Sequence, residues 1–211
     1  MIRKNDFIEL EFVGREVNGP VFDTNIPEEA KELGINVENK LFIICVGQKM
    51  VIEGLDKALE GKEIDKQYTI VLSAKEAFGD RRKEMVKLIP LKSFTEKNVT
   101  PQAGMTLSLD NHLVRIASVS GGRVLVDFNN PLSGKEITYG FKIKKQITDV
   151  SEKLKSLLNY FLKQEFDFKI EGKKAVFSNK NPIAEPAVAM LNDKFKDVLG
   201  IELIVDKKEG Q

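Results

Sequence analysis

The sequence of 211 residues predicts an α+β protein built in three parts. Strand patterns surround one short helix in the first 80 residues, charge density falls between residues 86 and 134, and amphipathic helices follow residue 149. We therefore expect an antiparallel sheet wrapped on a short helix (residues 1–85 and 135–148). We also expect an inserted all-β domain (86–134) and a C-terminal α+β module (149–211).

The first part carries three strand patterns and one helix pattern. Residues 7–13 (FIELEFV) alternate apolar and acidic side chains, which is typical of a half-buried strand. Residues 41–46 are almost continuously apolar, and residues 67–73 alternate again. Between these strands, apolar residues recur every three to four positions, which predicts a helix over residues 51–59 with Gly61 as its C-cap.

The middle part is poor in charge. Only eight of the 49 residues from 86 to 134 are charged, which is about half of the 31% found in the whole chain. Two turn signals, Asp110-Asn111 and Gly121-Gly122, separate strand-like segments and predict hairpins. The stretch 136–147 is a further strand pattern, so it is expected to return the chain to the first domain.

The last part, residues 149–211, contains eleven basic and eleven acidic residues. An amphipathic helix begins near Asp149 or Ser151, either of which is a suitable N-cap. A hairpin around Glu171-Gly172, a second helix ending at Gly200 and a final strand (IELIV) follow. A core of about 60 residues is marginal alone. The module is therefore expected to pack on the rest of the chain or on a second subunit, which makes a homodimer possible.

Composition excludes several classes of protein. Net charge is +1 and pI about 7.7, without the basic excess of a general nucleic-acid-binding protein. No apolar run approaches the ~20 residues of a membrane span, and the N-terminus lacks the apolar segment of a signal peptide. The single cysteine, Cys45, excludes an intrachain disulfide and favours a cytoplasmic location. Its apolar neighbours predict a buried core residue.

Motifs of cofactor binding and of common catalysis are absent. There is no phosphate-binding glycine loop, no dinucleotide fingerprint, no C-x-x-C and no H-E-x-x-H. One histidine, His112 beside a predicted turn, and one cysteine do not make a metal cluster, so neither a metal nor a cofactor is predicted. What remains are apolar and aromatic side chains near turns, with Asp23 as a lone carboxylate directly after Phe22.

Three segments together resemble FKBP-type peptidyl-prolyl cis-trans isomerases in order and spacing. They are GREVNGPVFDT, VGQKMVIEGLDKALEG and SAKEAFGD, with F-D, V-I-x-G and A-F-G as the signature pieces. The resemblance covers roughly residues 1–148 and implies an FKBP-like fold. The insertion after A-F-G-D resembles the insert-in-flap chaperone domain of SlyD-like members, and the C-terminal module resembles the extra module of long archaeal members.

The resemblance also implies roles for individual residues. Asp23 is the candidate for an electrostatic contact to the rotating amide, with a purely structural role as its alternative, and Phe78 and Tyr139 are the further catalytic candidates. Phe78 stands where the family has a tyrosine, and Leu55 takes the place of the tryptophan that floors the pocket in many members. The residues implied to bind the substrate are Phe12, Phe22, Phe42, Val51, Ile52 and Leu55.

The implied activity is isomerisation of X-Pro bonds in unfolded or folding polypeptides, which breaks no bond and needs no nucleophile. The inserted domain is implied to capture these clients through apolar side chains. The same side chains are also expected to build the domain's own core, so both roles stay open. The candidates are Leu88, Ile89, Phe94, Met105, Leu107 and Leu109.

Two other hypotheses belong to different classes. A holdase or dimeric binding protein with a vestigial pocket fits the departures at Leu55 and Phe78. A metal-handling protein is disfavoured by the single histidine and the single cysteine. Isomerisation of a short proline peptide, with wild type compared with Asp23→Ala and Phe78→Ala, separates the isomerase from the holdase.

Overall fold

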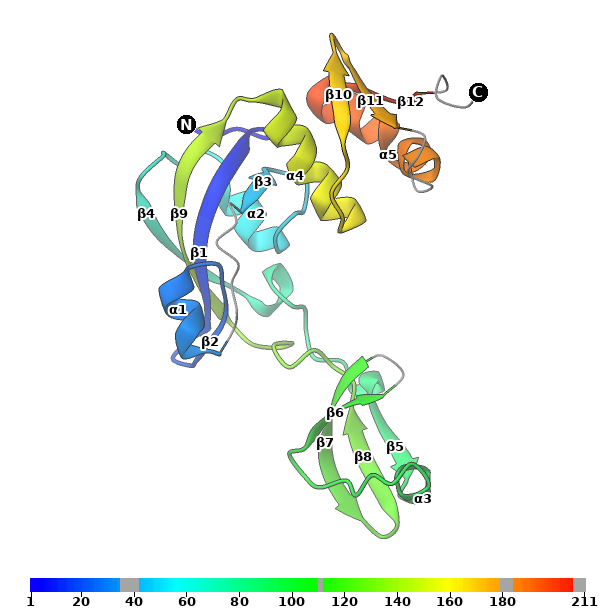
Figure 1. The fold of residues 1–211 in the computed structure, drawn as a ribbon. Helices are drawn as coiled ribbons and strands as arrows, with labels where there is room; N and C mark the ends of the chain where they lie inside the picture. The colour runs from blue at the N-terminus through cyan, green and yellow to red at the C-terminus, as the bar shows by residue number, and fades with distance from the viewer. Residues whose placement is uncertain (35–41, 110–111, 179–183, 207–211) are drawn as a thin grey trace. The chain divides into compact units, whose positions relative to one another are not determined.

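The computed structural model describes residues 1–34, 42–109, 112–178 and 184–206 (Figure 1). The predicted α+β class is confirmed, because antiparallel sheets and a few helices make up the chain. The chain divides into two compact units. The first comprises Met1–Gly14, Val21–Ile70 and Tyr139–Gln211, and the second comprises Arg15–Pro20 and Val71–Thr138.

A five-stranded sheet contains the strands predicted around residues 7–13, 41–46, 67–73 and 136–147. Its order is β2-β1-β9-β4, and β3 pairs antiparallel with the start of β1. Residue 41, the first of the predicted strand 41–46, lies outside the described residues. The strands are β1 (Phe7–Glu16), β2 (Val21–Thr24), β3 (Ile43–Cys45), β4 (Gln67–Leu72) and β9 (Ile137–Ile147).

The core of this sheet follows the alternation of the sequence. Ile8, Leu10 and Phe12 of β1 are buried, and so are alternate residues of β9 from Ile137 to Ile143. Alternate side chains of a strand point to one face, so the two strands present one continuous apolar surface. Cys45 is fully buried beside it, and burial, together with the nearby Asp56 carboxylate, raises the pKa of its thiol to about 12.

Helix α2 (Glu53–Leu59) confirms the predicted helix, although it begins two residues later than expected. Leu55 and Leu59 are buried, and Gly61 follows the helix with a positive φ of 76°. The expectation of one helix in this part was wrong, because a second one, α1 (Pro27–Glu32), also forms. Its start has a proline at the first turn and two acidic residues that favour a helix N-terminus.

The second unit contains a four-stranded antiparallel sheet of order β5-β8-β7-β6. Gly121 and Gly122 turn between β7 and β8 with positive φ, as the hairpin signal predicted. The other signal, Asp110-Asn111, lies outside the described residues. Elements of this unit are η1 (Ala74–Glu76), η2 (Lys83–Met85), β5 (Val86–Pro90), α3 (Lys92–Thr95), β6 (Thr106–Leu109), β7 (His112–Ser120) and β8 (Arg123–Asp127).

The expectation that the inserted segment is all-β was wrong at one place. Helix α3 is a single turn, and its Phe94 is only 3% exposed. The ring packs with buried residues of β7 and β8, among them Val114 and Val126. Four residues are too few for a helical repeat to be visible, so the pattern could not reveal this turn.

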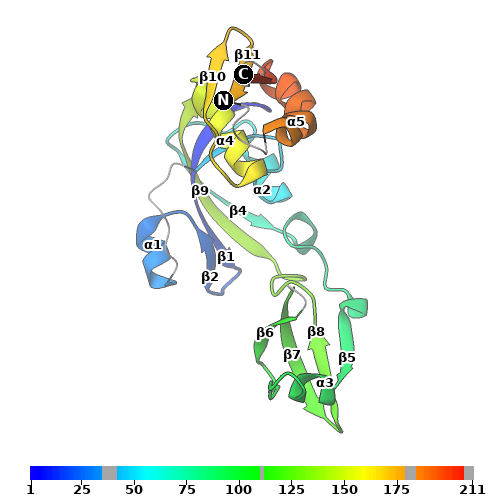
Figure 2. The ribbon, with the colours of Figure 1, turned by 45° about the vertical axis from the view of Figure 1, so that its right-hand side comes forward.

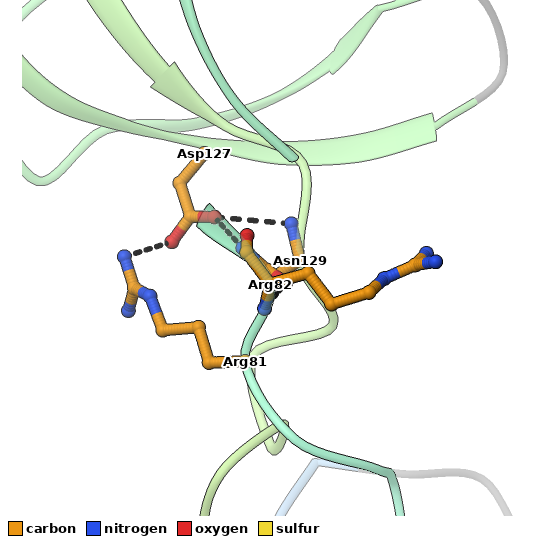
Figure 3. A network of polar contacts seen from close by, with 4 residues as sticks. All are labelled: Arg81, Arg82, Asp127 and Asn129. Atoms are coloured by element: carbon orange, nitrogen blue, oxygen red, sulfur yellow. Dashed lines mark hydrogen bonds and ion pairs between the residues drawn. The ribbon is translucent and has the colours of Figure 1, made fainter. Parts of the chain in front are cut away.

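Four residues join the chain just before the inserted segment to the end of its strand β8 and the residues after it (Figure 3). The Asn129 side chain accepts a hydrogen bond from the Arg82 amide and donates to the Arg82 carbonyl, at 2.9 and 3.0 Å. It also donates to the Asp127 carboxylate at 2.7 Å, and Arg81 forms an ion pair with that carboxylate. We call this group the Asn129 clasp.

The C-terminal module has the predicted order of helix, hairpin, helix and strand. Asp149 is the N-cap of α4, since its carboxylate accepts a hydrogen bond from the Glu152 amide at 2.8 Å. A three-stranded sheet follows in the order β10-β11-β12, with β12 parallel to β11. Figure 2 shows the hairpin of β10 and β11. The elements are α4 (Val150–Leu162), β10 (Phe168–Glu171), β11 (Lys174–Ser178), α5 (Ala184–Leu199) and β12 (Glu202–Asp206).

Helix α4 packs against β3 of the first sheet and against α5. Leu154, Leu157 and Leu158 on its apolar face are buried, as an amphipathic helix requires. Two lysines lie over aromatic rings of neighbouring elements. Lys153 of α4 lies over Phe7 of β1 at 5.6 Å, and Lys194 of α5 lies over Phe161 of α4 at 4.5 Å. The module therefore buries part of its apolar surface within its own chain, and the homodimer stays a prediction.

Candidate active site

A cavity of about 340 Å³ opens in the first compact unit between the sheet, helix α2 and helix α4. One apolar wall comes from strands β1 and β9, and the floor from α2. The residues that line it are Phe12, Asp23, Phe42, Lys49, Met50, Val51, Ile52, Leu55, Tyr139 and Tyr160.

Three aromatic rings form the apolar wall. The Phe12 ring lies 5.5 Å from Phe42 and 5.9 Å from Tyr139, in tilted arrangements that aromatic pairs favour. Phe12 and Tyr139 are 7% and 2% exposed, so the sheet fixes both rings. Such a wall offers a proline ring apolar contact from several sides.

The backbone of Phe12 is held by the side chains of Thr24, the last residue of β2, and Asn25, which follows it. Its amide donates to the Asn25 side chain at 2.8 Å, and its carbonyl accepts from the Thr24 hydroxyl at 2.9 Å. The Asn25 amide group donates in turn to the Leu10 carbonyl at 2.6 Å. These bonds fix this part of β1. They also place Asp23, the residue before Thr24, at the cavity.

Asp23 is the carboxylate of the cavity. Partial burial among apolar groups raises its pKa, and a hydrogen bond from the Thr24 backbone opposes this rise. Burial also raises the pKa of the Tyr139 hydroxyl, and the nearby Asp23 charge adds to the effect. A charge in such surroundings is screened less than in water, so its effect on a bound amide is stronger.

The rim of the cavity is a turn that leads into α2. The buried carboxylate of Asp56 accepts hydrogen bonds from the amides of Gly47 and Lys49, both at 2.8 Å. Gly47 and Lys49 have positive φ of 79° and 57°, and the two hydrogen bonds to the Asp56 carboxylate stabilise the turn in this conformation. Met50, Val51 and Ile52 follow this turn and line the cavity.

The last wall comes from the C-terminal module. Tyr160 of α4 lines the cavity, and its hydroxyl donates to the Lys49 carbonyl at 2.8 Å. The two residues are 111 positions apart in the chain. Helix α4 therefore contributes to the site itself.

Comparison with known proteins gives the family. A model for FKBP-type peptidyl-prolyl cis-trans isomerase matches residues 1–99, and a model described as the FKBP26 IF domain matches residues 87–132. A short-type peptidyl-prolyl cis-trans isomerase from Methanocaldococcus jannaschii is 30% identical over 147 residues, which are 68% of this chain and 93% of that protein. The chain belongs to the FKBP-type peptidyl-prolyl cis-trans isomerases.

A second relative agrees with this assignment. An FKBP-type isomerase named SlyD from Helicobacter pylori is 30% identical and spans 67% of this chain and 72% of its own length. A crystal structure of a peptidyl-prolyl isomerase from Pseudomonas syringae pv. tomato covers 70% of this chain and 69% of its own, at 14% identity and a TM-score of 0.35. That likeness is too distant to carry an argument.

Most residues that the FKBP resemblance implied lie at this cavity. Phe22 is not among the lining residues; it packs edge-on against Tyr139 with ring centres 5.9 Å apart. Phe78 belongs to the second unit, where its carbonyl accepts a hydrogen bond from Ser133 at 3.2 Å. Its catalytic role stays a prediction. Those brought together are Phe12, Asp23, Phe42, Val51, Ile52, Leu55 and Tyr139.

The residues expected to capture clients differ in exposure. Leu88 and Met105 are 54% and 39% exposed. Phe94 is buried in the core of the inserted segment, so it is not part of an exposed surface. The other three, Ile89, Leu107 and Leu109, are partly buried and pack against the same core.

Lys49, Met50, Asp56 and Tyr160 belong to the site but were not predicted. Lys49 and Met50 precede the recognised V-I-x-G motif directly, so extending the motif would have found them. No group of three or more metal-binding side chains occurs within the part of the chain that the structure describes. No helix in the described ranges is both long and apolar enough to cross a membrane.

Proposed function

We propose that the cavity between Phe12, Leu55 and Tyr139 binds the proline of an X-Pro bond, and that the inserted segment captures unfolded chains for it. The observation that supports the first part is the grouping of three aromatic rings and one carboxylate in a single cavity. Its volume of about 340 Å³ is at the small end of the ~300–1,000 Å³ typical of ligand pockets.

The chemistry follows from amide resonance. The C–N bond is partly double, which gives a barrier of about 18–20 kcal/mol and slow exchange of X-Pro bonds. In the twisted transition state resonance is lost, and the carbonyl oxygen gives up negative charge. An apolar cavity stabilises this less polar state more than the planar amide, and each ~1.4 kcal/mol of preference raises the rate tenfold.

Asp23 is assigned an electrostatic role in this step. A carboxylate facing the carbonyl is repelled less when the oxygen loses negative charge, so it favours the twisted amide. The raised pKa of Asp23 reflects partly desolvated surroundings, where such an effect is larger. Leu55, which is 1% exposed, supplies the floor against which the proline ring packs.

Acceleration of cis-trans exchange in a short Phe-Pro peptide tests this part. Wild type is expected to accelerate the exchange, and Asp23→Ala to reduce the acceleration. Phe78→Ala in the same assay tests the role predicted for that ring. A wild-type protein that does not accelerate the exchange would favour the holdase alternative.

Client capture is assigned to the face of the four-stranded sheet opposite its core. Leu88 pairs with Leu125 across β5 and β8, so both lie on one face of the sheet. Leu113 is next to the buried Val114 on β7, so it points to the face opposite the core, and it is 61% exposed. Exposed apolar side chains on one face are what a surface for unfolded chains needs.

Deletion of residues 86–134 tests client capture. The shortened protein is expected to keep its activity on short peptides and to lose most of its effect on proline-limited protein refolding, because capture raises the local concentration of prolines. Leu88→Ser with Leu113→Ser is expected to act in the same direction, with Leu107→Ala as a control at a side chain that packs on the core. Unchanged refolding by the deletion protein would refute the assignment.

The proposed domain division is 1–85 with 135–148, 86–134, and 149–211. The family match over residues 87–132 supports the inserted domain in this division. Expression of residues 86–134 alone is expected to give a folded domain, measurable by amide dispersion in NMR spectra. Assembly of a homodimer through the C-terminal module is a separate proposal, which light scattering of the full chain tests.

A further inference from the structure

Helix α4 lines a second cavity beside the proline cavity. This second cavity is about 420 Å³, and we call it the α4 groove. Phe42, Met50 and Tyr160 line both spaces, so the groove and the proline cavity are neighbours. The complete lining is Phe42, Ile43, Met50, Glu152, Lys155, Ser156, Asn159, Tyr160 and Lys163.

The two sides of the groove differ chemically. The side formed by Phe42, Ile43 and Met50 is apolar. The opposite side is polar, because residues three and four apart on α4 share one face and carry hydroxyl, amide and charged groups. Extended polypeptide presents apolar side chains and backbone hydrogen-bonding groups together, and it therefore matches both sides.

The groove also carries a charge preference. Lys155 and Lys163 line it against one acidic residue, Glu152, so its net charge is positive. Lys155 and Lys163 are exposed, and the Lys163 ammonium lies over the Tyr160 ring, 4.8 Å from its centre. Acidic or neutral residues beside the proline are thus favoured over basic ones.

We infer that the α4 groove binds the substrate residues next to the X-Pro bond, so that the C-terminal module sets sequence preference for the isomerase reaction. The inference rests on the proposed use of the proline cavity. Its occupant is the same polypeptide whose proline sits beside Tyr160, because Phe42, Met50 and Tyr160 line both cavities. Tyr160 is then a residue that positions this chain where it leaves the proline cavity.

Peptides of two lengths test this inference. A blocked Phe-Pro dipeptide is compared with the same unit extended by four residues on both sides, in acidic and basic versions. Wild type is expected to show a kcat/KM about three- to tenfold higher for the acidic extended peptide, as one or two hydrogen bonds provide. The basic version is expected to show little gain over the dipeptide.

Charge reversal in the groove provides the matched comparison. Lys155→Glu is expected to remove the gain from the acidic peptide and to give a gain for the basic one. Lys173→Glu, an exposed lysine in the hairpin turn, is expected to behave as wild type. Equal kcat/KM for short and extended peptides, or equal behaviour of the two variants, would overturn the inference.

Two further measurements separate this inference from the proposed function. Asp23→Asn lowers the activity on short and extended peptides alike if the proline cavity is correctly assigned. Amide signals of residues 152–163 are followed by NMR while the extended acidic peptide is added to the full chain. Shifts in these signals support the groove whatever the result for Asp23→Asn, and their absence refutes it.

Discussion

Asp56 offers the sharpest test of how the site is built. Its side chain is buried, with a residue exposure of 5%, and its two oxygens accept hydrogen bonds from the amides of Gly47 and Lys49. We predict that Asp56→Ala destabilises the protein and weakens substrate binding together. The reason is that one carboxylate holds the turn that leads into the cavity rim.

The magnitude follows from the two bonds. A hydrogen bond to a charged group contributes ~1.5–3 kcal/mol, and both bonds measure 2.8 Å. In the variant the turn relaxes and water partly satisfies the two freed amides, so the loss is smaller than the sum of both bonds. The free energy of unfolding is therefore expected to fall by about 3 kcal/mol. Asp56→Asn keeps one acceptor oxygen and is expected to lose roughly half of this amount.

Urea denaturation of the full chain measures the change, with Asp149→Ala as the control. Asp149 caps α4 through one exposed hydrogen bond of the same length, which is worth ~1 kcal/mol. KM for a proline peptide is measured on the same samples and is expected to rise for Asp56→Ala. A loss of stability in Asp56→Ala no larger than in Asp149→Ala would refute the reasoning.

Four other predictions concern single residues. Because the pKa of Asp23 is raised from 3.8, kcat/KM is expected to fall with decreasing pH already above that value, and Asp23→Asn to flatten the profile. The same raised pKa means that ionisation of Asp23 opposes folding, so Asp23→Asn should raise Tm at pH 7 but not below about pH 4, where unfolded aspartate is itself protonated. Gly14→Ala places a Cβ 2.9 Å from two aromatic rings, so it is expected to lower the free energy of unfolding by ~1–3 kcal/mol and to lower activity. Gly140→Ala, whose nearest neighbour lies at 3.7 Å, is expected to be nearly neutral. Denaturation and a peptide assay measure both variants. Asn129→Ala breaks the clasp and is expected to speed hydrogen exchange at the Arg82 amide while leaving peptide activity unchanged.

The sequence predicted the elements whose apolar pattern is long. Strands β1 and β9 are ten and eleven residues long and alternate over most of their length, and α4 repeats over thirteen, so each pattern is visible without the structure. The short helices α1 and α3 escaped prediction. The single turn of α3 is an example, because four residues define no period.

Only those site residues that belong to a recognised motif could be predicted from the sequence. The F-D and V-I-x-G pieces led to Asp23, Val51 and Ile52, all of which line the cavity. Asp56 and Tyr160 act on backbone groups, and a backbone acceptor or donor leaves no mark in the sequence. Tyr160 also reaches the site from a module that family motifs do not describe, so its position emerges only from the packing of α4.

The place of β9 in the sheet has a consequence for how the chain folds. This strand lies between β1 and β4, yet it leaves the ribosome only after the whole stretch 86–134 has been made. The four strands of that stretch pair with one another, so it has the contacts to fold while the larger sheet still lacks its central strand. During synthesis, the segment proposed to hold unfolded chains is thus complete before the isomerase sheet, and the first unfolded chain within its reach is its own.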